Sequence, residues 1–124
     1  MRQQTILVVE DDPTLQFVAR RALTHLGYQC LAVGSGEAAL EADHTQVSLI
    51  FMDIGLPGMD GTKTASMIRE LEARDGRPRV PIVALTAHSD RQACLLAGMD
   101  DFLQKPALLG DLQQMVGKWL PQTE

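Results

Sequence analysis

Short apolar segments alternate with helical patterns along the whole chain, and this alternation constrains the fold more than any other feature of the sequence. Predicted strands cover residues 5–9, 29–33, 49–52, 81–85 and 101–104. The third strand is apolar throughout, as expected of a central parallel strand that is covered on both faces. Helical patterns fall between the strands, so the strands should run parallel and be joined by helical crossovers. We therefore expect an α/β fold in which helices cover both faces of a five-stranded parallel sheet.

Capping residues and apolar stripes mark the helices between these strands. Asp12 and Pro13 begin the first helix as its N-cap and first helical residue, and Gly27 ends it. Its buried stripe has helical spacing and comprises Leu15, Val18, Ala19, Ala22, Leu23 and Leu26. Further helices are expected over residues 36–42, 62–74 and 90–97. The last helix should bury one face made of Leu108, Leu112, Met115, Val116 and Trp119.

Length and charge limit the classes of protein to consider. The 124 residues suit a single domain, and a formal net charge of −5 without any basic run argues against nucleic-acid binding. No apolar stretch approaches the roughly 20 residues of a membrane span, and no signal-peptide pattern opens the chain. Cys30 and Cys94 lack metal-type spacing and are expected to be reduced thiols. These features favour a cytoplasmic protein, with a monomer as the preferred state.

Polar and ionisable side chains stand at the carboxyl ends of four predicted strands. Glu10 and Asp11 follow the first strand, and Asp53 follows the third. Thr86 follows the fourth, and Lys105 follows the fifth. Open α/β sheets bind ligands at this edge. Because a buried charge is costly unless a partner or a metal compensates it, these side chains should form one site.

The chemistry of these residues selects a hard cation over a nucleotide. No GxGxxG or GxxxxGK[ST] loop occurs, and the acidic turn after the first strand would repel a phosphate. Carboxylates suit Mg²⁺, with Mn²⁺ as an alternative ion. The expected ligands are Asp11, Asp53, Glu10 through a water, and the backbone carbonyl of Gly55. Asp53 could then attack a phosphoryl group whose oxygens Lys105 and Thr86 hold.

Four segments carry a resemblance to a known family. They are residues 6–12 (ILVVEDD), 52–61 (MDIGLPGMDG), 84–87 (ALTA) and 104–106 (QKP). In this order they resemble the receiver domains of two-component response regulators. The resemblance covers essentially the whole chain and implies a flavodoxin-like, doubly wound (βα)5 fold with strand order 2-1-3-4-5. It also implies a receiver domain over residues 1–120 and a tail over residues 121–124.

The resemblance gives each site residue a role. Asp53 is the phosphoacceptor, Glu10 and Asp11 are the acidic pair around Mg²⁺, Thr86 is the switch hydroxyl, Lys105 is the site lysine and Phe102 is the switch aromatic. The implied function is transfer of a phosphoryl group from phosphohistidine to Asp53, which switches a partner-binding surface. Such a protein is a signalling receiver and not an enzyme, apart from assisting its own phosphorylation and slow self-dephosphorylation.

Residues 81–87 and 97–103 further resemble receivers attached to hybrid sensor histidine kinases. Those receivers take phosphate from a histidine and pass it to a histidine phosphotransfer domain, so a sensor kinase or a phosphotransfer protein is the implied partner. The stretch from Thr86 to Lys105 is shorter than is usual in the family, which affects its usual output face. No effector domain follows the last helix, so the chain should be a stand-alone receiver or a part of a larger kinase.

Two other functions fit parts of the pattern. A phosphorylation-independent interaction module, a pseudo-receiver, would keep the fold, but the intact acidic site argues against it. A phosphatase that forms an aspartyl phosphate would want a second carboxylate two residues after the nucleophile. Gly55 occupies that position, so turnover beyond slow self-hydrolysis is not expected.

Several neighbouring residues have simpler interpretations. Asp12 is expected to cap a helix and not to be a third acidic ligand, and Asp60 should be a cap or turn residue. Asp100 and Asp101 are expected to be solvated. The resemblance suggests a cis peptide bond between Lys105 and Pro106.

Two further positions carry hypotheses about regulation and docking. His88 should be solvent-exposed by default, but it could instead border the phosphoryl group and, with Gly55, tune its hydrolysis. Phe17 lies off the buried stripe of the first helix and should point outward close to the acidic pocket. We expect Phe17 to help dock the phosphodonor.

Overall fold

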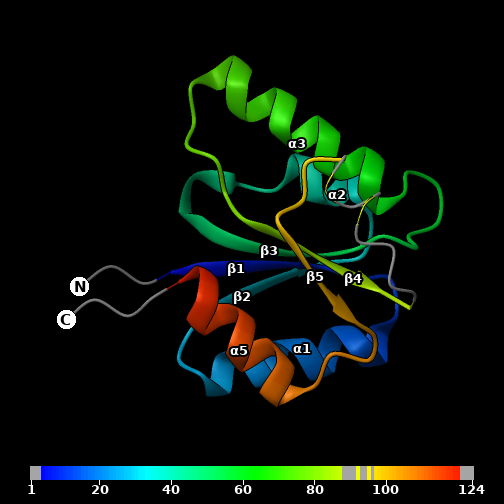
Figure 1. The fold of residues 1–124 in the computed structure, drawn as a ribbon, viewed down its shortest axis with the longest axis vertical. Helices are drawn as coiled ribbons and strands as arrows, with labels where there is room; N and C mark the ends of the chain where they lie inside the picture. Colours follow the sequence, from blue (N-terminus) through cyan, green and yellow to red (C-terminus); the bar gives the residue numbers. More distant parts are fainter. Residues whose placement is uncertain (1–3, 88–91, 93–94, 96, 121–124) are drawn as a thin grey trace.

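A parallel sheet organises the computed structural model, which describes residues 4–87, 92, 95 and 97–120. Its strands are β1 (Thr5–Val9), β2 (Gln29–Val33), β3 (Val47–Asp53), β4 (Ile82–Thr86) and β5 (Asp101–Gln104). They lie in the order β2-β1-β3-β4-β5, and every neighbouring pair is parallel (Figure 1). The predicted fold class and strand order are therefore confirmed.

Helices cover both faces of this sheet. Helices α1 (Pro13–His25) and α5 (Leu109–Trp119) lie on one face, and α2 (Gly36–Glu41) and α3 (Gly61–Asp75) lie on the other (Figure 1). A short 3-10 helix, η1 (His44–Gln46), was not predicted and leads into β3. This arrangement is the doubly wound, flavodoxin-like α/β fold.

The strands divide the interior into two apolar layers, because successive side chains of a strand point to opposite faces. From β1, Leu7 and Val9 pack towards α2 and α3, whereas Ile6 and Val8 pack towards α1 and α5. All four side chains are fully buried. The central strands are thus packed on both faces, and this packing fixes the positions of their carboxyl ends.

Helix caps follow the sequence closely. Asp12 Oδ1 accepts hydrogen bonds from the N–H groups of Thr14 and Leu15, at 2.8 and 3.3 Å. Asp60 Oδ1 likewise accepts from the Lys63 N–H at 2.9 Å and caps α3. Both aspartates are therefore caps, as predicted.

One strand boundary and one helix face differ from the sequence-based predictions, and one predicted helix is not tested by the described residues. Strand β3 begins at Val47 and not at residue 49, because the polar Ser48 interrupts the apolar run but does not interrupt the strand. Leu108 precedes α5 as its N-cap residue and is 57% exposed, so it does not belong to the buried face of that helix. The helix predicted over residues 90–97 falls largely outside the described residues, as do His88 and Cys94.

The prediction that Asp100 and Asp101 are solvated is wrong. Asp101 is 9% exposed and accepts hydrogen bonds from Lys118 Nζ (2.7 Å) and Trp119 Nε1 (3.1 Å). The Asp100 carboxylate accepts from Arg69 and Arg79, at 2.7 and 2.8 Å. The donors come from α3, α5 and the segment before β4, so the local sequence gives no sign of them.

The sheet has a clear polarity. Strand β1 begins and helix α5 ends on the same side of the molecule, whereas the carboxyl ends of the strands lie on the opposite side (Figure 1). Leu120, just beyond α5, shares a small surface pocket with Tyr28, the residue before β2. Among the described residues, no helix combines the length and apolar character needed to cross a bilayer.

Candidate functional site

The end of β1 delivers two acidic side chains to the carboxyl edge of the sheet. The Glu10 N–H donates to the carbonyl of Val33 in β2 at 3.0 Å, one residue beyond the paired part of β1. The Glu10 side chain turns inward and is nearly buried, and its Oε2 accepts from the Asp12 N–H at 3.1 Å. Asp11, between them, is exposed. One turn therefore supplies a buried and an exposed carboxylate.

Strand β3 places Asp53 beside this pair. Asp53 is 3% exposed, and its Oδ1 accepts from the Gly55 N–H at 2.8 Å. The loop after it returns close to the strand end, because a Cβ atom at Gly61 would collide with the main chain of Asp53 and Ile54. Only glycine fits at position 61, and this close approach supports the turn that carries Asp53.

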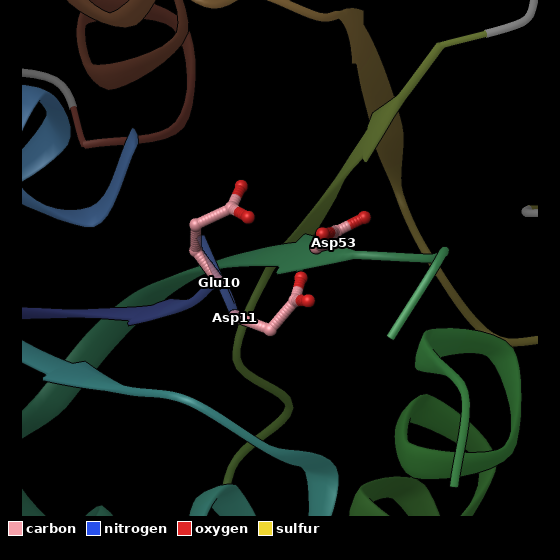
Figure 2. A group of neighbouring side chains, drawn as sticks. All are labelled: Glu10, Asp11 and Asp53. Carbon is pink, nitrogen blue, oxygen red and sulfur yellow. The ribbon is translucent and has the colours of Figure 1, made fainter. Parts of the chain in front are cut away.

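The three carboxylates form one cluster. Oxygen atoms of Glu10, Asp11 and Asp53 lie within 4.8 Å of one another, and Figure 2 shows the side chains at the ends of β1 and β3. A set made only of oxygen ligands fits a hard divalent cation such as Mg²⁺ or Mn²⁺.

Lys105 lies against the same cluster. Its Nζ is 3.1 Å from Asp53 Oδ2 and 3.2 Å from Glu10 Oε1. The backbone N–H of Lys105 donates to the Thr86 carbonyl at 2.7 Å. The peptide bond between Lys105 and Pro106 is cis, as predicted. One ammonium faces three carboxylates, so the site keeps an excess of negative charge that a divalent cation could neutralise.

The pKa values of Glu10 and Lys105 are both raised within this cluster. Burial raises the pKa of Glu10, and the neighbouring charge of Asp53 raises it further; the Asp12 N–H and Lys105 oppose this only in part. Burial alone would lower the pKa of Lys105, but hydrogen bonds to Asp53 and Glu10 and their charges outweigh it and raise the pKa. The ammonium is thus held charged, whereas the buried carboxylate of Glu10 is stabilised less than it would be in water.

An open cleft brings together most of the predicted site. It is lined by Glu10, Asp11, Asp12, Asp53, Ile54, Gly55, Thr86, Ala87 and Lys105. Thr86 is 2% exposed at the end of β4. The cleft thus contains the predicted ligand residues, the lysine and the hydroxyl, and Asp12 borders it while capping α1.

Two predicted residues stand outside the lining of this cleft. Phe102 is partly buried in β5 and packs against the apolar layer under α2 and α3. Phe17 is 60% exposed on α1, as predicted, with the Arg21 guanidinium carbon 5.7 Å from its ring centre.

One residue near the site has no counterpart among the predictions. Gln16, on α1, donates from Nε2 to the Glu10 carbonyl at 2.9 Å. Gln16 directly follows Leu15, the first residue of the buried stripe of α1. This position beside the stripe is the only sign in the sequence that Gln16 faces inward.

Comparisons with known proteins agree with this fold and identify the family of the chain. The family model of the response regulator receiver domain matches residues 6–117, and the chain belongs to this family. The sensor histidine kinase GacS of Pseudomonas protegens is 42% identical over 123 residues, which cover 95% of this chain. The match spans 13% of that kinase, so it concerns one domain of a much longer protein.

Solved structures give the same result. The receiver domain of the sensor histidine kinase PA1611 from Pseudomonas aeruginosa, with magnesium in its active-site cleft, has a TM-score of 0.83 and 40% identity over 97% of this chain and 99% of that one. A structure of the yeast phosphotransfer protein Ypd1 with the receiver domain of Ssk1 gives a TM-score of 0.89 and 30% identity, covering 95% of this chain and 89% of that one. The chain is thus a two-component receiver domain whose relatives include receivers of hybrid sensor kinases.

Proposed function

We propose that this domain accepts a phosphoryl group on Asp53 from the phosphohistidine of a partner, in a Mg²⁺-dependent step. The observation that supports it most is the cleft in which the Asp53 carboxylate lies beside Asp11, Glu10 and Lys105. An attacking carboxylate, a cation site and a fixed ammonium are the parts that phosphoryl transfer by positioning and charge needs.

The proposed roles divide the cleft between cation and phosphoryl group. Asp11, Asp53 and the Gly55 carbonyl would bind Mg²⁺ directly and Glu10 through a water, and Mn²⁺ could replace it. When bound, the cation neutralises the carboxylates and the phosphoryl oxygens. An Asp53 oxygen forms the bond to phosphorus as the phosphorus–nitrogen bond of the donor histidine breaks, and its electron pair stays on the imidazole. Lys105 Nζ would then pair with a phosphoryl oxygen.

Phosphorylation would also switch a partner-binding surface. The new group carries a charge of about −1.5 to −2, in place of the single charge of the Asp53 carboxylate, and brings three acceptor oxygens next to the end of β4. The Thr86 hydroxyl would move towards one of these oxygens, and the space it leaves would let Phe102 turn inward. His88 and Gly55 would tune how fast water removes the group.

Asp53→Asn tests this function, because asparagine keeps the size of the side chain but lacks the carboxylate nucleophile. We expect the wild-type protein to take up one phosphoryl group from acetyl phosphate in the presence of Mg²⁺, and EDTA to prevent it. Asp53→Asn should take up none, as measured by intact-protein mass spectrometry after rapid quenching. Stoichiometric phosphorylation of Asp53→Asn at another residue would contradict the assignment.

The proposed partner is a sensor histidine kinase or a histidine phosphotransfer protein, and Phe17 would contribute to docking it. Phe17 is exposed on α1, which begins directly after the acidic turn, and Arg21 extends this surface. Phe17→Ala should slow phosphotransfer from the partner several-fold but leave labelling by acetyl phosphate unchanged. Leu31→Ala, at an exposed residue of the edge strand β2, is the matched control. Equal loss with both donors would refute the docking role.

A phosphorylation-independent interaction module is the alternative function. Mg²⁺ titration separates the two, since a module without phosphotransfer has no need to bind the cation. A cytoplasmic location, a monomeric state, the absence of nucleic-acid binding and a receiver domain that ends near residue 120 remain predictions.

A further inference from the structure

Gln16 ties helix α1 to the acidic turn. The residue is half-buried, and its Nε2 donates a 2.9 Å hydrogen bond to the carbonyl oxygen of Glu10. Its backbone N–H donates to the carbonyl of Asp12, also at 2.9 Å. One residue of the helix therefore contacts the turn on both sides of Asp11.

The Glu10 carbonyl depends on a donor from outside the sheet. Strand β1 ends at Val9, and the Glu10 N–H makes the last contact with the β2 side by donating to Val33 at 3.0 Å. The carbonyl of a nearly buried residue needs a partner, because an unpaired buried acceptor costs about 1–3 kcal/mol. The Gln16 amide supplies it, and its length lets it span from the helix to the strand end.

Asp11 is the residue that this contact would fix. It is the exposed member of the acidic cluster, and it lies between Glu10, whose carbonyl Gln16 holds, and Asp12, whose carboxylate caps α1. Holding the residues on both sides restricts the backbone of Asp11 and hence the direction of its carboxylate. Mg²⁺ requires near-octahedral oxygen ligands at about 2.0–2.1 Å, so a small displacement of one ligand weakens binding.

We propose that Gln16 is a positioning residue for the divalent cation: its side-chain amide holds the turn from Glu10 to Asp12 so that Asp11 can share the ion with Asp53. The inference rests on the proposed function, since it assumes that the cluster takes Mg²⁺. Gln16 is not among the residues that line the cleft. Its loss should therefore lower Mg²⁺ affinity but leave the phosphorylation rate at saturating Mg²⁺ unchanged.

Calorimetric titration with Mg²⁺ alone tests this proposal on the wild-type protein, Gln16→Met and Gln16→Asn. Methionine keeps the length, neutral charge and helix propensity of glutamine but has no donor. Asparagine keeps the amide but is one methylene too short. Loss of one hydrogen bond corresponds to roughly fivefold weaker Mg²⁺ binding in both variants. Gln114→Met, at an exposed glutamine of α5, is the matched control and should bind Mg²⁺ like the wild type.

Two further measurements separate positioning from a merely structural role. Thermal unfolding without Mg²⁺ reports the stability of each variant, and acetyl phosphate labelling over a range of Mg²⁺ concentrations should show that high Mg²⁺ restores the wild-type rate. Equal Mg²⁺ affinity of the wild type and both Gln16 variants would overturn the proposal, even if the variants unfold at lower temperature. A wild-type protein that binds no Mg²⁺ would overturn the proposed function and this inference together.

Discussion

Asp12 shows how a residue that borders the acidic cluster can serve as a helix cap. Its Oδ1 accepts two backbone hydrogen bonds from the first turn of α1, although the residue also borders the acidic cleft. The capping geometry occupies this oxygen, and the carboxylates close enough together to hold a cation are those of Glu10, Asp11 and Asp53.

Two substitutions at this position should therefore have different effects. Asp12→Ala removes the cap and should lower the free energy of unfolding by about 1 kcal/mol, whereas Asp12→Asn keeps it. Urea unfolding measures the first effect, and Mg²⁺ titration of Asp12→Asn measures whether the lost charge matters. Asp12→Asn should bind Mg²⁺ far better than Asp11→Asn; equal losses in the two variants would identify Asp12 as a ligand.

Asp101 is a buried carboxylate with a stabilising role away from the cleft. Burial by itself would raise the pKa of Asp101, but hydrogen bonds from Lys118, the Phe102 N–H and Trp119 outweigh it and hold the pKa below its ordinary value. A carboxyl group whose pKa is lower in the folded state stabilises the protein above its unfolded pKa, near 3.9. This stabilisation is lost as the pH falls through the pKa that Asp101 has in the folded protein.

Asp101→Asn should therefore unfold more easily at neutral pH. The expected loss is about 1–2 kcal/mol, because Lys118 is largely exposed and solvent screens its charge. The difference from the wild type should shrink below about pH 4, where the wild-type carboxylate also becomes protonated. Thermal unfolding from pH 3 to pH 8, followed by Trp119 fluorescence, measures this. A difference that stays constant over the whole range would show that charge is not the cause.

At the scale of elements, Arg69 joins α3 to the β4–β5 side of the sheet. Its guanidinium donates to the Glu72 carboxylate, to the Asp100 carboxylate and to the carbonyls of Val80 and Gly98, at 2.7–2.9 Å. The side chain is 14% exposed, so these pairs are shielded from water. The planar donor fork of arginine serves all four acceptors at once.

Arg69→Met should thus destabilise the fold by about 3 kcal/mol, because it leaves two partly buried carboxylates short of a partner. Arg69→Lys should recover little, since one ammonium cannot reach four separated acceptors. Arg74→Met is the control, as Arg74 is 71% exposed and pairs only weakly. Urea unfolding of the three variants measures these differences in stability. An Arg69→Met protein as stable as Arg74→Met would refute the role of this network.

The same elements show what the sequence could and could not predict. The parallel sheet, the helix caps and the residues of the cleft were predictable, because alternating strands and helices, capping aspartates and charges at strand ends each follow local rules. The strand order was predicted only from the resemblance to receiver domains. The pairing of Asp100 with Arg69, of Asp101 with Lys118, and of Gln16 with the Glu10 carbonyl was not predictable. The first pair joins residues 31 positions apart, and the second joins residues 17 positions apart. The third depends on the angle at which α1 leaves β1, and this angle follows from packing against the sheet.

For the whole molecule, cation binding and stability should be linked. A ligand that binds only the folded state adds about 2.7 kcal/mol at a concentration one hundred times its dissociation constant. Mg²⁺ should therefore raise the unfolding temperature of the wild type, EDTA should reverse it, and Asp11→Asn should lose the effect. Calorimetry at constant ionic strength, with added NaCl as the control, measures this. An equal rise in Asp11→Asn would place the responsible ion elsewhere.

The polarity of the sheet has a practical consequence for experiments on this domain. Strand β1 begins and α5 ends on the side away from the cleft (Figure 1). A sensor chip or bead coupled through either end would therefore hold the domain with the cleft that contains Asp53 open to the solution. Phosphodonors and Mg²⁺ could then be washed across the immobilised protein in either order, and each phosphoryl transfer could be followed on the same molecules.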